Sequence, residues 1–225
     1  MNIESCIENS LTKIFFIGYN NTGTTSLSNF FHKNNMNNEL DSPFTGEYPK
    51  TFFNNYKTKL SKEEWDKRRY EIYSKHNIIL INEPTSNIIN ELLIKFPSSV
   101  FILNDRKIEK WISTRIKSCL INSSINKNIT NNTGLYLQEY LTYGNEVFNI
   151  WIKRRQKYYS YLDTIKTKIN ILNVCDDDEW HYKLRDILNK NHINVIPYNF
   201  HSKSTDKNYL YDKNKYLQIF SNITF

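Results

Sequence analysis

Four short runs of consecutive apolar residues constrain the fold of this chain more than any other feature. Each run is too short for a helix and is rich in Ile, Phe and Val at successive positions. Strands that are buried on both faces show this pattern, whereas strands with one solvent face alternate apolar and polar residues. The predicted strands are 13–18, 77–82, 99–104 and 168–174.

Helical patterns separate these runs. The stretch 86–96 is the clearest, because its apolar residues fall on one stripe and Ser86 can cap the first turn. The other predicted helices are 24–33, 62–75, 109–120, 135–165 and 178–189. Alternation of strands and helices favours an α/β fold with a mostly parallel sheet. We therefore expect one domain over residues 1–225, built in three layers from about four to five strands with helices on both faces.

The segment between the first predicted strand and its helix is typical of a phosphate-binding loop. After the strand come Gly18, four further residues and Gly23, and small hydroxyl side chains then open the helix. Unpaired N–H groups at a helix start carry the positive end of the helix dipole, so a phosphate can bind there. The alternative is an ordinary tight turn. The candidate binding residues of this loop are Asn20, Asn21, Thr22, Gly23, Thr24, Thr25 and Ser26.

One position separates this loop from that of ATPases and GTPases. The Walker pattern has Lys directly after the second Gly, and Thr24 stands there in this chain. No Lys would reach the β- and γ-phosphates of a nucleoside triphosphate. The sequence thus predicts a P-loop NTPase-like fold whose ligand is anionic, and it weakens an ATPase or GTPase function.

Two blocks of the sequence resemble sulfotransferases that use 3′-phosphoadenosine 5′-phosphosulfate (PAPS). The run Gly-x-x-x-Thr-Gly-Thr-Thr-Ser-Leu after an apolar strand is similar to that family's donor-binding loop. The block 84–115 resembles its run from a strand-end Pro, through a helix and Phe-Pro, to a strand followed by Arg, Trp and a hydroxyl residue. The resemblance implies that Arg106 and Thr114 hold the donor's 3′-phosphate, with Ser113 as a substitute for Thr114.

Later blocks follow the family's order as well. The stretch 169–189 is similar to a late strand, an acidic turn and a helix bearing Trp, and 197–204 lies where the family has a loop that closes over the nucleotide. The resemblance implies transfer of a sulfuryl group from PAPS, as co-substrate, to a hydroxyl or amine acceptor, with no metal. Lys203 belongs to the closing loop and is a further candidate ligand of the donor.

The catalytic positions depart from the family pattern. Where the family has Lys or Arg beside the phosphosulfate, this chain has Asn21, whose amide can still donate a hydrogen bond. Lys50 or Lys203 could supply the missing charge. The family's general base corresponds to Asn82, so we hypothesise that the neighbouring Glu83 accepts the acceptor's proton; a surface carboxylate flanking a helix is the alternative.

Two other functions stay open. A degenerate member of the same fold could bind nucleotide, or nothing, and act by interaction, as Asn21 and Asn82 suggest. A P-loop small-molecule kinase would share the first strand and loop, but it would not explain the pairing of Arg106 with Thr114.

Charge and composition narrow the partners. The net charge of +7 is scattered along the chain, which suits a small anionic ligand better than nucleic acid. The chain contains no alanine and is rich in Asn, Ile, Lys and Tyr, a bias that indicates an AT-rich genome rather than a function.

The cysteines and the apolar runs bear on location. The three cysteines are odd in number and lack metal-ligand spacing, which favours a reducing compartment. No signal peptide is visible, and no apolar run approaches the roughly 18 residues of a membrane span. We expect a cytoplasmic protein that binds neither membrane nor nucleic acid.

Overall fold

The computed structural model describes residues 12–19, 22–36, 38–41, 70–71, 73–81, 86–125, 135–198 and 212–225. Within these residues five strands form one sheet, in the order β2-β3-β1-β4-β5, and each neighbouring pair is parallel. The strands are β1 (Ile14–Phe16), β2 (Glu39–Asp41), β3 (Ile78–Ile81), β4 (Val100–Asn104) and β5 (Ile169–Leu172). The predicted α/β fold with a parallel sheet is confirmed.

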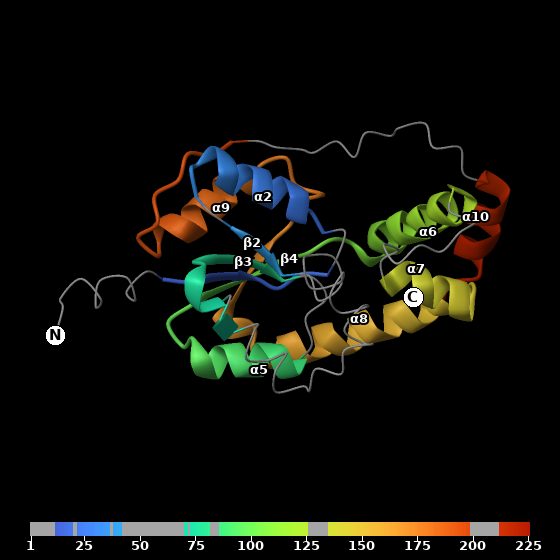
Figure 1. Ribbon diagram of the computed structural model, residues 1–225, viewed down its shortest axis with the longest axis horizontal. Helices are drawn as coiled ribbons and strands as arrows, with labels where there is room; N and C mark the ends of the chain where they lie inside the picture. The colour runs from blue at the N-terminus through green and yellow to red at the C-terminus, as the bar shows by residue number, and fades with distance from the viewer. Residues whose placement is uncertain are drawn as a thin grey trace.

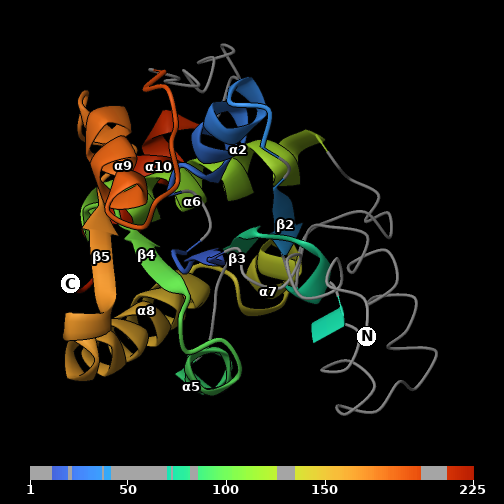
Figure 2. The same ribbon diagram turned by 90° about the vertical axis from the view of Figure 1, so that its left-hand side faces the viewer.

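Helices cover both faces of the sheet. Figures 1 and 2 show α2 (Thr24–Lys33) and α9 (Trp180–Asn189) on one face, and α5 (Ser86–Lys95) and α8 (Glu146–Thr164) on the other. Alternate residues of β1 enter the two cores: Phe16 packs with Phe31 of α2, and Phe15 packs in the cluster that includes Trp151 of α8. A strand buried on both sides needs apolar residues at every position, which is why 14–17 read as a continuous apolar run.

A second helical group lies beyond the carboxyl ends of the strands. Helices α6 (Ile108–Ile125), α7 (Leu135–Tyr143) and α10 (Lys213–Ser221) gather at the right of Figure 1, and the long helix α8 runs from this group back under the sheet. A 3₁₀ turn at Lys166–Lys168 connects α8 to β5. No helix in the described part of the chain is both long and apolar enough to cross a bilayer.

The order of the strands creates a switch point between β1 and β4. The chain leaves β1 through α2 for β2 on one side of the sheet, whereas it leaves β4 through α6, α7 and α8 for β5 on the other side. The connections therefore diverge at the carboxyl ends of β1 and β4. In open α/β sheets this is the place where ligands bind.

Two sequence predictions of the fold are wrong. The single helix expected over 135–165 is two helices, because Gly144 adopts a left-handed conformation (φ 59°) after α7 and redirects the chain into α8. The run 168–174 is not buried on both faces: β5 is an edge strand of the described sheet, and Ile171 is 66% exposed. An exposed apolar residue such as Ile171 gives the same run of apolar letters as a buried one, so the sequence pattern could not show that this strand lies at the edge of the sheet.

Other parts of the prediction differ only in detail. Strand β2 was not predicted, because its three residues are too few to show a periodic pattern. Helix α10 was not predicted either, because its mixture of aromatic and polar residues gives no clear period. Most of the helix expected over 62–75 lies outside the described residues, and its end at 70–71 and 73–75 is helical.

The central strand should dominate stability. Phe16 is fully buried in β1, so Phe16→Ala should lower the free energy of unfolding by about 3–5 kcal/mol, through lost burial and the cavity that remains. Ile94 of α5 is 78% exposed, and Ile94→Ala should change it by less than about 0.5 kcal/mol. Urea denaturation of both variants measures the difference. Similar losses in the two variants would contradict this assignment of the core.

Candidate functional site

The loop that follows β1 is fastened to the end of β4 by a chain of hydrogen bonds. The side-chain amide of Asn104, the last residue of β4, donates from Nδ2 to Oγ1 of Thr22 at 2.6 Å. The Thr22 hydroxyl donates in turn to the backbone carbonyl of Tyr19. Asn104 and Thr22 are both fully buried. The hydroxyl of Thr22 is therefore used to shape the loop, whereas the sequence had assigned it to the ligand.

Two glycines allow this close packing. A Cβ atom on Gly18 would lie 2.3 Å from both the backbone oxygen and Oδ1 of Asn104, so a side chain at this position would collide with the end of β4. Gly23 has φ 98°, and a Cβ there would lie 2.6 Å from a side-chain carbon of Val174 and 3.3 Å from Sγ of Cys175. The carboxyl ends of β1, β4 and β5 thus meet around the loop. Gly23 is required by its backbone conformation and by its packing against the residues that follow β5.

The start of α2 faces the same region. The helix begins at Thr24, and Gly23 before it has no side chain that could cap the first turn. N–H groups of a first turn have no partner within the helix, so they suit an anion. Thr24 is half-buried and Thr25 is exposed, whereas Ser26 is buried. Residues 22–26, the described part of the predicted loop, therefore lie together at the start of α2, and their contact with a ligand stays a prediction.

Arg106 lies in the turn between β4 and α6. After β5, burial raises the pKa of the Cys175 thiol, and the charges of Arg106 and Lys110 oppose that rise. Arg106 follows Asn104 by two residues, and Asn104 bonds Thr22, so Arg106 and the loop after β1 lie at the carboxyl ends of neighbouring parallel strands. This juxtaposition is the one that the sequence resemblance required.

The two hydroxyl residues predicted beside Arg106 lie further along α6. The Thr114 hydroxyl donates to the backbone oxygen of Lys110 at 2.9 Å, and Thr114 stands one helical turn beyond Lys110 on the same stripe. Ser113 shares a hydrogen bond of 2.8 Å with the hydroxyl of Tyr216 in α10. Ser113 therefore joins two helices, and Thr114 is the better placed of the two to serve a ligand beside Lys110.

The loop after β5 is tied to α6 by an ion pair. Asp176 Oδ1 lies 2.7 Å from Nζ of Lys110, and the N–H of Lys107 donates to the other carboxylate oxygen at 3.3 Å. Burial alone would raise the pKa of Asp176, but these bonds and the charge of Arg106 hold it below its ordinary value. Asp176, the first residue of the acidic run 176–179, therefore ties the loop after β5 to the start of α6. No group of three or more His, Cys, Asp or Glu side chains is arranged for a metal within the described residues.

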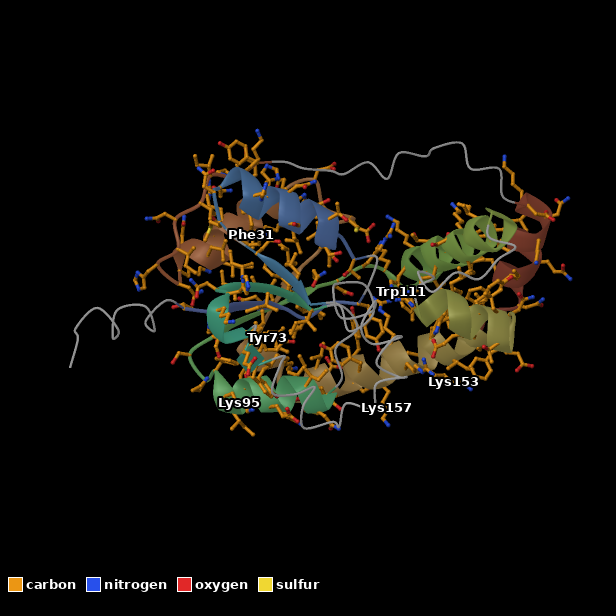
Figure 3. The ribbon with its side chains drawn as sticks, viewed as in Figure 1. Phe31, Tyr73, Lys95, Trp111, Lys153 and Lys157 are labelled. Atoms are coloured by element: carbon orange, nitrogen blue, oxygen red, sulfur yellow. The ribbon has the colours of Figure 1, made fainter. Side chains whose placement is uncertain are left out.

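Sequence reasoning missed the buried residues behind Arg106. Of the three consecutive basic residues at 153–155 in α8, Lys153 and Arg154 are exposed, whereas the side chain of Arg155 is 4% exposed. Figure 3 shows Lys153 and Lys157 projecting away from the sheet and Trp111 where α6 approaches it. Arg155 lies on the inward stripe of α8 with Trp151 one turn before it, and this spacing was the signal that could have found it.

Several predicted site residues lie outside the described residues. These are Asn20, Asn21, Asn82, Glu83, Lys50 and Lys203. Both catalytic assignments, Asn21 as a donor and Glu83 as a base, are among them and stay predictions.

Comparison with protein families identifies one match. A family model described as "Sulfotransferase domain" matches residues 13–161, more than half of the chain, from before β1 to near the end of α8. The matched region contains the loop after β1, Arg106 and the buried Arg155. No curated protein matches the sequence.

Gly23 and Gly144 form a matched pair for testing the loop. Both adopt positive φ, but a Cβ at Gly144 would meet nothing within 4 Å. Gly144→Ala should cost about 1–2 kcal/mol of stability, the cost of the left-handed conformation alone. Gly23→Ala should cost about 1–3 kcal/mol more, because its Cβ must displace Val174. Equal losses in urea denaturation would contradict the packing described here.

The Thr22 hydroxyl should be essential to the loop. Thr22→Val keeps the shape of the side chain but leaves the buried amide of Asn104 and the Tyr19 carbonyl without this partner, so it should cost about 1–3 kcal/mol. Thr22→Ser keeps the hydroxyl and should cost less. A loss in the Ser variant as large as that in the Val variant would show that the methyl group matters instead.

Proposed function

The chain belongs to the sulfotransferase family, and on that premise we propose that it transfers a sulfuryl group from PAPS to a hydroxyl or amine acceptor. The observation that carries the proposal is the position of Arg106 two residues after β4, whose last residue bonds the loop after β1 at the switch point of the sheet. A donor with phosphate groups at both ends of its ribose needs two anion sites. The carboxyl ends of β1 and β4 offer the start of α2 and the guanidinium of Arg106.

Each of the two sites would bind one anionic group of the donor. The 5′-phosphosulfate would lie on the backbone N–H groups of residues 22–26 and on the hydroxyls of residues 24–26, at the start of α2. The 3′-phosphate would lie on Arg106 and Thr114, because a guanidinium forms paired hydrogen bonds with phosphate oxygens and a hydroxyl adds another. Lys203 would contribute from the loop that closes over the nucleotide.

The reaction would be an in-line displacement at sulfur. The acceptor oxygen or nitrogen forms a bond to sulfur while the bond from sulfur to the bridging oxygen breaks, and the electron pair of that bond stays on the 5′-phosphate. Glu83 would take the acceptor's proton, and Asn21 would donate a hydrogen bond to the bridging oxygen. The protein contributes positioning and stabilisation of the developing charge, and the proposed chemistry uses no metal.

The proposed location is the cytoplasm. Within the described residues Cys119 and Cys175 are free thiols, and burial raises the pKa of Cys119 to about 12. A buried thiol with so high a pKa is poorly reactive, and free thiols suit a reducing compartment, where PAPS-dependent transfer to small acceptors can proceed.

Ligand-dependent thermal unfolding tests the donor assignment. We expect 3′-phosphoadenosine 5′-phosphate, the product nucleotide, to stabilise the protein by about 2.7 kcal/mol at a hundred times its Kd, and ATP at the same concentration to stabilise it much less. Arg106→Met should remove most of the stabilisation. Lys153→Met, an exposed change on α8, is the control and should leave it unchanged.

Transfer of labelled sulfate from PAPS to a panel of phenols, alcohols and amines tests catalysis. Turnover above the background supports the proposal. Stabilisation by the product nucleotide without any turnover would instead favour a non-catalytic binder, and stabilisation by ATP alone would favour a kinase.

A further inference from the structure

The backbone of Arg106 is held on both sides by side chains. Its N–H donates to Oδ1 of Asp105 at 2.7 Å, and its carbonyl accepts a hydrogen bond from Nη2 of Arg155 in α8. Asp105 is itself anchored, since its N–H donates to the Leu172 carbonyl of β5 at 2.9 Å. Arg106 follows a strand and precedes a helix, so neither element would fix its polar backbone groups without these side chains.

Arg155 links the parts of this arrangement. Its Nη2 lies 2.9 Å from Oδ1 of Asp105 and 3.0 Å from the hydroxyl of Tyr159, and the Tyr159 hydroxyl also donates to Asp105. The guanidinium lies 5.0 Å from the ring centre of Trp111 and 4.6 Å from that of Tyr159. One planar group thus contacts the strand end, the turn and two aromatic rings, a geometry that a lysine ammonium cannot reproduce.

Burying a guanidinium is costly unless its charge is compensated. Here Asp105 compensates Arg155, and burial is the main reason why the pKa of Tyr159 is raised well above its ordinary value, so the phenol stays a neutral donor. Lys110 is compensated by Asp176. The two buried or half-buried carboxylates of this region are thus each paired with a cation, Asp105 with Arg155 and Asp176 with Lys110.

We propose that Arg155, supported by Asp105 and Tyr159, is a positioning residue that sets the direction of Arg106 and thereby the protein's selectivity for a nucleotide bearing a 3′-phosphate. This inference rests on the proposed function, because it concerns the same donor site. Arg155 does not contact the nucleotide; it fixes the backbone from which Arg106 extends. A purely structural tie between α8 and β4 is the competing explanation.

Selectivity separates the two explanations. Isothermal titration of 3′-phosphoadenosine 5′-phosphate and of adenosine 5′-phosphate, which lacks the 3′-phosphate, gives the ratio of their affinities. In Arg155→Lys and Arg155→Met we expect this ratio to fall by about tenfold or more, the worth of a charged hydrogen bond to phosphate, while the affinity for adenosine 5′-phosphate changes by less than about twofold.

Two further variants sharpen the test. Tyr159→Phe keeps the ring and removes only the hydroxyl bonded to Asp105, so it should lower the ratio less than the Arg155 variants do. Arg154→Met is the matched control: Arg154 is the exposed neighbour on α8, paired with Glu139, and its loss should leave the ratio unchanged. Urea denaturation establishes whether each variant folds. If Arg155→Met does not fold, the affinity ratios of Arg155→Lys and Tyr159→Phe decide the test.

A double-mutant cycle tests the coupling to Arg106. Arg106→Met alone should lower the ratio, and adding Arg155→Met to it should lower the ratio no further, because the two residues act on one interaction. Additive losses would overturn the inference.

The outcomes distinguish this inference from the proposed function. If the unmodified protein shows no preference for the 3′-phosphate, the donor assignment fails and the inference fails with it. If the preference is present but the Arg155 variants keep it, or lose affinity for both nucleotides in parallel, the donor assignment stands and Arg155 is a structural residue only.

Discussion

The hydrogen bond from the Asn104 amide to the Thr22 hydroxyl ties together the two central strands of the sheet at the point where a ligand would bind. Both groups are fully buried, so neither could be satisfied by water if the other were removed. The bond also requires that Gly18 have no side chain, because the backbone of β4 and the Asn104 amide occupy that space. The shape of the loop after β1 therefore depends on β4 as much as on its own residues.

The positive charge of the chain and the charge of the site are different quantities. The net charge of +7 comes from basic residues scattered along the sequence, and screening weakens exposed charges over about 10 Å in ordinary buffer. At the carboxyl ends of the strands, by contrast, Lys110 is paired with Asp176 and Arg155 with Asp105, and Arg155 also holds the backbone carbonyl of Arg106. Selectivity for an anion would come from this local arrangement and not from the overall charge.

The sequence sufficed for those features that depend on neighbours along the chain. The bounds of α2 were predicted without error, and the glycines around the loop were found, because caps, apolar runs and turn residues act over a few positions. The break between α7 and α8 could have been read from Gly144, since glycine commonly ends a helix. The bonds that orient the site could not: Lys110 and Asp176 are 66 residues apart, and Arg155 and Asp105 are 50 residues apart. Only the packing of α8 and of the loop after β5 against the sheet brings these partners together.

One departure of this chain from the family pattern falls beside the phosphosulfate of the proposed donor, whereas Arg106, which the resemblance matches to the 3′-phosphate, is present. Asn21 leaves the loop after β1 without the cation that would face the phosphosulfate, whereas Arg106 is present and its backbone carbonyl is held by Arg155. Binding energy from a part of the substrate that does not react can still serve catalysis, because it holds the reacting bond in place. In a chain with a neutral loop, the 3′-phosphate would supply a larger share of the interactions that keep sulfur in line with the acceptor. The precision with which Arg106 is directed then matters more for turnover than it would in a relative that has a lysine beside the leaving oxygen.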